Sequence, residues 1–471
     1  MNILPKGFFY MKTFESLRTA YPVFLYKSHT VQDTGTTLQI TYHFEIPGLS
    51  AFDPVWTFPK KGPEPVRFEE NCTLQAMIFG LGMVELISYW KTACPPRVLV
   101  SAGPLSEAQI LWWKDLYYLG LGEFFYTNQI RTDTENFMEL ISSAPAFSGE
   151  AMPSEAKEGC LIPIGGGKDS ACTIELLKKS GQPLKTYILN PRGATLKTVD
   201  VSGLAAGDSI HAGRTLDSRM LALNKEGYLN GHTPFSALVA FSSLITAYLH
   251  GLRYIALSNE SSANESTVAG STVNHQYSKS FKFELDFHHY EKEWIGSGIH
   301  YFSMLRPLSE FQIAGYFAKA SAYHEIFRSC NVGSKQDIWC GHCPKCLFVF
   351  LILSPFLPHE RLIEIFGRDL TDDAALQEDF EKLTGVQEEK PFECVGSRDE
   401  VNAAVCLTIE RMGTEGTPLP ALLAWYKSQP VYERSFPLRH AYDRYYDPAH
   451  LLPEEFLRIL ADECYGGTLP C

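Results

Sequence analysis

The feature that most constrains this chain is a glycine-rich turn after an apolar run, "LIPIGGGKDSAC" over residues 161–172. Glycines let the backbone approach a ligand closely and point successive N–H groups at an anion. The residues after the turn have a helical pattern, and the N-terminal end of a helix carries a positive partial charge. The order strand, glycine turn, helix is therefore typical of an α/β protein that binds phosphate at this turn.

Two common phosphate-binding motifs do not fit this turn. A Walker A loop needs G-x-x-x-x-G-K-[ST], but Lys168 is followed by Asp169, and Ile162 stands at the first glycine position. A dinucleotide motif, G-x-G-x-x-G, would end on Ser170 instead of glycine. The stretch resembles the PP-loop of ATP pyrophosphatases, S-G-G-x-D-S, with Gly165 where that class usually has serine.

The PP-loop resemblance implies a doubly wound parallel sheet of the adenine nucleotide alpha-hydrolase type, with ATP and Mg²⁺ as cofactors. Such a loop holds the pyrophosphate portion of ATP, so the expected chemistry is adenylation of a carboxylate or amide oxygen with release of pyrophosphate. Asp169 is a candidate Mg²⁺ ligand, because Mg²⁺ prefers carboxylate and phosphate oxygens. The residues expected to bind the nucleotide here are Gly165, Gly166, Gly167, Lys168, Asp169 and Ser170.

The chain has 471 residues, enough for two or three domains. Residues 1–150 mix β-rich runs with one helical stretch, which predicts an α+β domain, a candidate for substrate recognition. Residues 142–159 are rich in Ser, Pro, Gly and Ala and predict a linker. Residues 160–350 alternate strand and helix patterns, which predicts a parallel sheet with helices on both faces. Residues 351–471 predict a mainly helical region.

Composition narrows the range of partners. The formal charge of −13 argues against general nucleic-acid binding, which usually needs a basic excess. The N-terminus lacks the pattern of a signal peptide, and the apolar stretch from Ala237 is broken by polar residues, so it predicts a buried helix followed by a strand. We expect a cytoplasmic protein with a small-molecule substrate and no membrane partner. Nothing in the sequence indicates an oligomeric state.

Four cysteines, Cys330, Cys340, Cys343 and Cys346, have the spacing C-x9-C-x2-C-x2-C. Converging thiols in a reducing compartment favour a closed, tetrahedral Zn²⁺ site with a structural role. The arrangement also resembles the zinc-binding end of PP-loop enzymes that make 7-cyano-7-deazaguanine. The alternative is that these are ordinary reduced cysteines at the start of a helix. Core or surface positions suffice for the other eight cysteines, Cys394 among them.

Polar residues follow two further strands of the predicted sheet. Asn190 and Arg192 come after the second strand, and Ser258, Asn259 and Glu260 come after "YIAL". Ligands of doubly wound folds collect at the carboxyl ends of the strands, so both loops are candidates for contacts with nucleotide or Mg²⁺. The alternatives are a simple turn for the first loop and a polar capping loop for the second.

Candidate acid and base groups lie just beyond the second of these loops. His275, Tyr277 and Lys279 occur in "NHQYSKS", with Glu260 and Asp217 as further candidates. Histidine is the side chain whose ordinary pKa lies nearest neutrality, which suits proton transfer. A hydrogen-bonded structural histidine is the alternative.

An anionic substrate would need local positive charge in this acidic chain. Arg214, Arg219 and Arg306 are candidate substrate-binding residues, together with Arg192 and Lys279, because guanidinium groups bind phosphate and carboxylate in bidentate fashion. Taken singly, each of these residues is also compatible with an ordinary surface salt bridge.

Several longer motifs narrow the resemblance. They are "GGGKDS", "HAGRTLDSRM", "GYLNGHTPFSALVAFSS", "ALSNESSANE", "VNHQYSKSFKFE", "MLRPLSEFQIA", "CGHCPKC" and "KPFECVGSRDE". Together they make the chain similar to the MurL family of UDP-N-acetyl-α-D-muramoyl-L-alanyl-L-glutamate epimerases, over about residues 160 to 400. The resemblance implies an enzyme of peptidoglycan precursor synthesis, hence of cell-wall biogenesis and cell shape. It would use ATP and Mg²⁺ to invert the terminal L-Glu of UDP-MurNAc-L-Ala-L-Glu, releasing AMP and diphosphate.

Two alternatives stay open from the sequence. The first is another PP-loop adenylating enzyme with a different acceptor, such as a 7-cyano-7-deazaguanine synthase-like amidating enzyme or a tRNA-modifying enzyme. The second is a non-catalytic nucleotide-binding module, which the intact "KDS" at residues 168–170 disfavours.

Overall fold

The computed structural model describes residues 12–264 and 274–470, and it divides into two compact units. Unit 1 comprises residues 1–152 and 213–241, and unit 2 comprises residues 153–212 and 242–471. The first change of unit therefore falls inside the stretch 142–159 that is rich in serine and proline. A later segment returns to unit 1, and the C-terminal helical region belongs to unit 2 with the parallel sheet.

Unit 1 is built on a mixed sheet with the strand order β4–β2–β1–β5–β6. Strand β2 alternates half-buried and buried residues along its whole length, which is the pattern of a strand with one face on a core. Residues 213–215, at the end of β9, pair with β4. The strands of this unit are β1 Val23–Asp33, β2 Thr37–Ile46, β3 Ser50–Phe52, β4 Val55–Pro59, β5 Arg97–Val100 and β6 Glu139–Ser142. Its helices are α1 Phe14–Ala20, α2 Cys72–Trp90, α3 Glu107–Gly120, α4 Gly122–Thr127 and α7 Ser218–Lys225.

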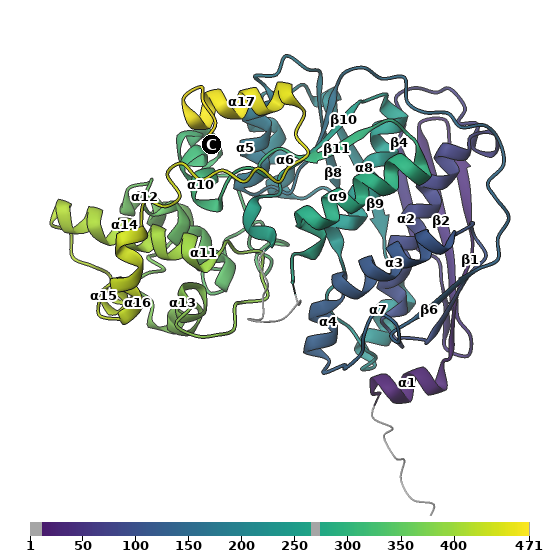
Figure 1. The fold of residues 1–471 in the computed structure, drawn as a ribbon, viewed down its shortest axis with the longest axis horizontal. Helices are drawn as coiled ribbons and strands as arrows, with labels where there is room; N and C mark the ends of the chain where they lie inside the picture. Colours follow the sequence, from purple (N-terminus) through teal and green to yellow (C-terminus); the bar gives the residue numbers. More distant parts are fainter. Residues whose placement is uncertain (1–11, 265–273, 471) are drawn as a thin grey trace, which may run out of the picture. The chain divides into compact units, whose positions relative to one another are not determined.

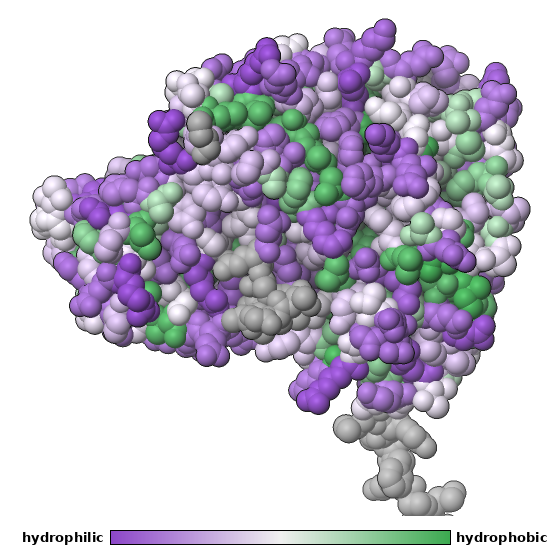
Figure 2. Space-filling model, viewed as in Figure 1, coloured by the Kyte–Doolittle hydropathy of each residue, from purple (hydrophilic) through white to green (hydrophobic). Residues whose placement is uncertain are grey.

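Helix α2 is the central core helix of unit 1. It begins with Asn71, whose side chain accepts a hydrogen bond from the Leu74 N–H, and it is apolar nearly all round. By length and composition α2 could cross a membrane, but 94% of that apolar window is buried within the structure. Its position is therefore that of a core helix. Hydrophilic residues cover most of the molecular face in Figure 2, with smaller apolar patches between them.

Unit 2 contains a parallel sheet with the strand order β11–β10–β7–β8–β9. Its strands are β7 Cys160–Pro163, β8 Leu184–Leu189, β9 Ser209–Thr215, β10 Tyr254–Leu257 and β11 His300–Ser303. The connecting helices are α5 Lys168–Leu177, α6 Gly193–Ser202, α8 Phe235–His250, α9 Phe281–Tyr290 and α10 Glu310–Lys319. This parallel sheet confirms the α/β class that the alternating patterns predict, and the apolar stretch from Ala237 forms helix α8 before strand β10.

The strand order of this sheet reverses next to β7. From β7 the chain moves outward through β8 to β9, and it then returns to the other side of β7 with β10 and β11. In open parallel sheets ligands bind in the crevice outside the carboxyl ends of strands at such a reversal. The glycine loop follows β7 and the "SNESSAN" loop follows β10, so both candidate loops lie at this point.

The C-terminal helices extend the core of unit 2. They are α11 Pro344–Leu353, α12 His359–Phe366, α13 Gln377–Thr384, α14 Arg398–Glu415, α15 Ala421–Lys427, α16 Pro430–Ser435 and α17 Glu454–Tyr465. The last of them, α17, packs against α5, the helix that starts at the glycine loop (Figure 1). Buried residues of β7, α5, α10 and the helices from α11 onward form one continuous apolar cluster. The helical C-terminal region predicted from the sequence is therefore confirmed as helical, and it shares a core with the sheet.

Candidate functional site

The glycine loop joins β7 to α5 and has one strict requirement for glycine. Gly166 has φ of +82°, and a Cβ atom added there would lie 3.0 Å from the Cβ of Ala194. Positive φ and this close packing both exclude larger residues. Gly165 differs, because an added Cβ would have no neighbour within 4 Å. Gly167 is the N-cap of α5, so the first N–H groups of that helix face the loop.

Lys168, the first residue of α5, is almost completely buried. Its ammonium group forms ion pairs with the carboxylates of Asp169 and Glu310. Burial alone would lower the pKa of Lys168, but the two carboxylates outweigh burial and raise it. Burial opposes the charge of Asp169 too, yet Lys168 and two further lysines hold its pKa below the usual range. Asp169 is therefore an ionised carboxylate, and its side chain is 31% exposed.

Two buried glutamates connect this lysine to the C-terminal helices, and sequence reasoning missed both. The backbone N–H of Glu310 donates to the carboxylate of Glu400 at 2.6 Å, and the Ser397 N–H and hydroxyl donate to the same carboxylate at 2.7 Å each. Burial, opposed by Lys168, raises the pKa of Glu310 to about 7. Burial and the nearby Glu310 raise the pKa of Glu400 to about 7 as well. The signal available in the sequence was the pair of motifs that contain them, "LSEF" and "SRDE".

The loop after β10 is held in place by β11 and the segment that follows it. Asn259 donates to the Ser303 hydroxyl at 3.1 Å, and Ser261 donates to the carbonyl of Leu308. The buried hydroxyl of Ser258 has no hydrogen-bond partner among the described residues. Glu260 is 4% exposed, and its charge contributes to the raised pKa of the nearby Glu310. The last residue of the "SNESSANE" motif, Glu265, lies outside the described residues.

Arg306, predicted to bind substrate, is fully buried and contacts both the loop after β10 and the segment before α9. Its guanidinium group pairs with Glu284 at 2.9 Å and donates to the backbone carbonyls of Glu260 and Lys279. The structure therefore brings Glu260 and Lys279 together through this one side chain.

His275, Tyr277 and Lys279 all lie on the short segment before α9. Lys279 is close to Glu260 and Asp169, and their charges, with that of Cys394, raise its pKa against the effect of burial. His275 hydrogen-bonds with the side chain of Cys394. Tyr277 is buried and contacts Phe283 edge to face.

The loop after β8 lies beside the segment of the cysteine cluster. Asn190 adopts a left-handed conformation with φ of +52°, and Arg192 caps α6 and donates to the Ser334 hydroxyl at 3.3 Å. The segment of the cysteine cluster also contacts the glycine loop. The backbone N–H of Arg328 donates to the carbonyl of Gly166 at 2.7 Å.

The four cysteines at residues 330, 340, 343 and 346 converge. The Sγ–Sγ distances are 3.8 Å for Cys330–Cys343, 3.7 Å for Cys340–Cys346 and 3.5 Å for Cys343–Cys346. Four thiolates at about 2.3 Å from a tetrahedral Zn²⁺ lie about 3.8 Å from one another. These distances are too long for disulfides and fit the geometry of a Zn²⁺ site.

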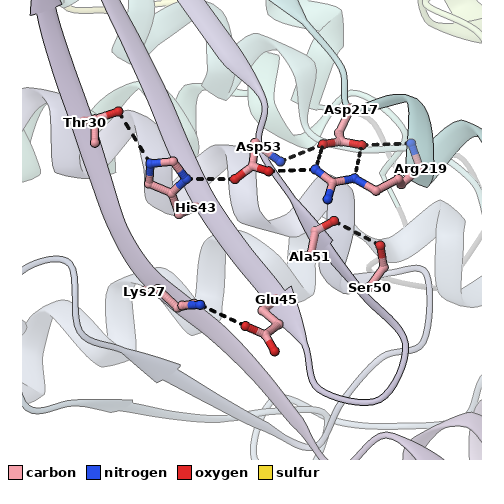
Figure 3. A network of polar contacts seen from close by, with 9 residues as sticks. All are labelled: Lys27, Thr30, His43, Glu45, Ser50, Ala51, Asp53, Asp217 and Arg219. Atoms are coloured by element: carbon pink, nitrogen blue, oxygen red, sulfur yellow. Dashed lines mark hydrogen bonds and ion pairs between the residues drawn. The ribbon is translucent and has the colours of Figure 1, made fainter.

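Three predicted residues lie in unit 1. Arg214 forms a bidentate pair with the buried Glu85, at 2.9 and 3.0 Å. Asp217 and Arg219 pair with each other at the start of α7, and Arg219 also binds Asp53 at 2.7 Å (Figure 3). Burial opposes the charge of Asp217, but Arg219 and backbone donors lower its pKa. These three residues belong to unit 1, whereas the glycine loop belongs to unit 2.

Comparison with known proteins defines the class first. The family model described as the MurL N-terminal domain matches residues 15–304. The family model described as the MurL C-terminal domain matches residues 326–428. The chain is thus an α/β protein with the two MurL domain types in series.

Individual relatives agree with these domain matches. The chain is 35% identical to a protein of Salinispora tropica over 80% of this chain and 82% of the relative. It is 35% identical to a protein of a Micromonospora species over 77% of this chain and 81% of the relative. It is 34% identical to a protein of Xanthomonas oryzae pv. oryzae over 70% of this chain and 74% of the relative. All three are named UDP-N-acetyl-alpha-D-muramoyl-L-alanyl-L-glutamate epimerase. The chain belongs to the MurL family.

The raised pKa of Glu400 predicts how stability depends on pH. The folded state binds this proton more tightly than the unfolded chain, so the stabilisation is fully present below the unfolded pKa and is lost as the pH rises through about 7. In Glu400→Gln, the fall in melting temperature between about pH 5 and 8 is expected to be smaller than in the unaltered protein.

Thermal denaturation over this pH range tests the expectation. Glu433→Gln is the control, because Glu433 is exposed and should leave the pH dependence unchanged. An identical pH dependence in Glu400→Gln and the unaltered protein would contradict the assignment.

Proposed function

We propose that this chain is an ATP-dependent epimerase that inverts the terminal L-Glu of UDP-MurNAc-L-Ala-L-Glu through carboxylate adenylation. AMP and diphosphate are released, and the product serves peptidoglycan precursor synthesis in the cytoplasm. The observation that carries the proposal is the glycine loop at the strand-order reversal of unit 2, in a chain whose relatives carry the epimerase name.

Adenylation solves the main chemical difficulty of the reaction. Removing the α-proton of a carboxylate would build a dianion, so this proton is very weakly acidic. Conversion to an acyl-adenylate removes the negative charge and lets the carbonyl accept the electron pair. A base then takes the α-proton, and a proton delivered to the opposite face gives the D centre.

The residues of the glycine loop have defined roles in this proposal. Backbone N–H groups of residues 165–168 and the N-terminal end of α5 hold the diphosphate portion of ATP. Asp169 is the Mg²⁺ ligand, which its ionised and part-exposed carboxylate fits. Mg²⁺ supplies charge neutralisation on the phosphate oxygens. Lys168 holds Asp169 and Glu310 in place by charge.

The cysteine cluster has a structural role in the proposal. Zn²⁺ bound by Cys330, Cys340, Cys343 and Cys346 fixes the segment whose Arg328 N–H contacts the glycine loop. The four sulfur donors and their spacing fit Zn²⁺. The chemistry of the reaction takes place elsewhere.

The direct test of the function is an assay in D₂O. The purified protein with ATP, Mg²⁺ and UDP-MurNAc-L-Ala-L-Glu is expected to introduce solvent deuterium at the glutamate α-carbon and to accumulate AMP and diphosphate. Mass spectrometry of the dipeptide and chiral analysis of its glutamate give the readout. If the glutamate keeps its L configuration and ATP stays intact, the proposed function is wrong.

The two glycines of the loop provide a matched pair of variants. Gly166→Ala forces a Cβ onto Ala194 in a left-handed conformation, so we expect the kcat/KM for ATP to fall by at least about 10-fold. Gly165→Ala adds a Cβ in open space and should change kcat/KM by less than about 3-fold. Steady-state diphosphate release measures both variants. Equal effects of the two substitutions would argue against phosphate binding at this loop.

The zinc proposal predicts metal content and stability. The purified protein is expected to hold about one Zn²⁺ per chain by elemental analysis. Cys343→Ser should lose most of the metal and several degrees of melting temperature, because the site closes a loop of the core. Cys464→Ser is the control, since Cys464 lies outside the cluster in α17. A metal-free protein with unaltered stability would refute a structural zinc site.

A further inference from the structure

The cysteine that sequence reasoning set aside, Cys394, lies among cationic side chains of unit 2. It precedes α14 and is half-buried. Its sulfur hydrogen-bonds with the side chains of Lys279 and His275. The ammonium group of Lys345, near the start of α11, donates to the carbonyl oxygen of Cys394. Three nitrogen-bearing side chains from two separate segments therefore surround this one residue.

The charge balance distinguishes Cys394 from other thiols of the chain. Burial disfavours its thiolate, but Lys279, His275 and Lys345 outweigh burial and lower the pKa to about 5. At Cys172 and Cys464, by contrast, burial outweighs the effect of the nearby lysine, and the thiol pKa is raised. Glu393 is the nearest acidic neighbour along the chain, and Glu260 and Asp169 act on Lys279. At neutral pH Cys394 is therefore a thiolate, stabilised by these neighbouring side chains.

Contacts connect this thiolate to the loops of the proposed active site. Arg306 binds the backbone carbonyls of both Lys279 and Glu260, and Lys279 interacts electrostatically with Asp169 beside the glycine loop. Gln276 donates to the carbonyl of Val395 at 3.2 Å. Its own Oε1 is buried and has no hydrogen-bond partner within the described part of the chain. Such an unpaired acceptor next to the thiolate is available to a donor of a bound ligand.

We infer that Cys394 is the base that removes the α-proton of the substrate's glutamate, with Lys279 and His275 as positioning residues. The inference rests on the proposed function and deepens it by naming a catalytic group. A part-buried thiolate whose sulfur accepts hydrogen bonds from Lys279 and His275 suits proton transfer from carbon, because it is ionised before the substrate arrives.

The proton transfer balances without any redox partner. The Cα–H bond breaks, the S–H bond forms, and the electron pair moves onto the carbonyl oxygen of the acyl-adenylate. A proton from a second acid, in exchange with solvent, then reaches the opposite face of Cα. Cys394 returns its proton to water, and hydrolysis of the adenylate releases AMP and the inverted dipeptide.

The test uses Cys394→Ala and Cys394→Ser in the full-length protein, assayed in D₂O with ATP, Mg²⁺ and the UDP-linked dipeptide. Both variants are expected to lose at least about 100-fold in deuterium incorporation and epimerisation. Release of AMP and diphosphate should stay within about 3-fold, because activation of the carboxylate does not need this base. Cys464→Ser, the same change at another half-buried thiol, should leave all rates unaltered.

Three results would overturn the inference. Undiminished deuterium incorporation in both variants would exclude Cys394 as the base. If AMP release fell as much as deuterium incorporation, Cys394 would be needed for activation of the carboxylate and not for proton removal. A dipeptidyl adduct on Cys394 after acid quenching of the unaltered enzyme would make it a nucleophile. If the unaltered enzyme incorporates no deuterium at all, the proposed function itself fails, so the two failures are distinguishable.

Alkylation of the unaltered protein provides a measurement that does not depend on how the variants fold. Iodoacetamide at about pH 6.5 is expected to label Cys394 before Cys464, since the thiolate is the reacting species. The dipeptide substrate with a non-hydrolysable ATP analogue should protect Cys394. Slower labelling of Cys394 than of Cys464, or labelling that the substrate does not slow, would count against the inference.

Discussion

The site depends on one buried ammonium group, that of Lys168. It is the first residue of α5, directly after the glycine loop, and it forms ion pairs with Asp169 and with Glu310 at the start of α10. Burying these charges is costly, and removing one partner of such a group typically destabilises a protein by about 3–5 kcal/mol. Because Glu310 in turn binds Glu400 near the start of α14, the lysine fixes the glycine loop relative to the C-terminal helices.

This arrangement explains why the helical C-terminal region matters for the site. The helices from α11 onward share one apolar core with the parallel sheet. They carry Lys345, and they position the segment with Cys394 close to Lys279 and His275. The cysteine cluster lies just before them, on a segment that contacts the glycine loop through Arg328. The sheet supplies the glycine loop that we propose binds ATP, and the C-terminal region supplies side chains that contact the neighbouring loops.

Local patterns in the sequence were sufficient to predict part of this structure. A β-rich run predicts the strand β2, and an apolar run followed by glycines and a helical pattern predicts β7, the loop and α5. The family also follows from motifs such as "SNESSANE" and "NHQYSKS". These features are local, since each depends on residues close together in the chain.

Long-range contacts could not be predicted in the same way. Glu310 lies 142 residues from Lys168, and Glu400 lies 90 residues from Glu310, so no local pattern joins them. In the sequence, residues 213–241 continue the strand–helix alternation. In the structure they belong to unit 1, and so do the predicted site residues Arg214, Asp217 and Arg219. Cys394 lies in the motif "KPFECVGSRDE", but that motif alone does not indicate a catalytic thiolate, because the cationic partners of Cys394 come from other segments.

The proposed chemistry requires that the glycine loop hold the diphosphate portion of ATP at the reversal of the parallel sheet. A crystal structure of the protein with a non-hydrolysable ATP analogue and Mg²⁺ tests it most directly. We expect the β- and γ-phosphates to lie against the backbone N–H groups of residues 165–168, with the metal ion next to Asp169. A triphosphate bound away from this loop would show that the glycine loop does not hold the diphosphate portion of ATP.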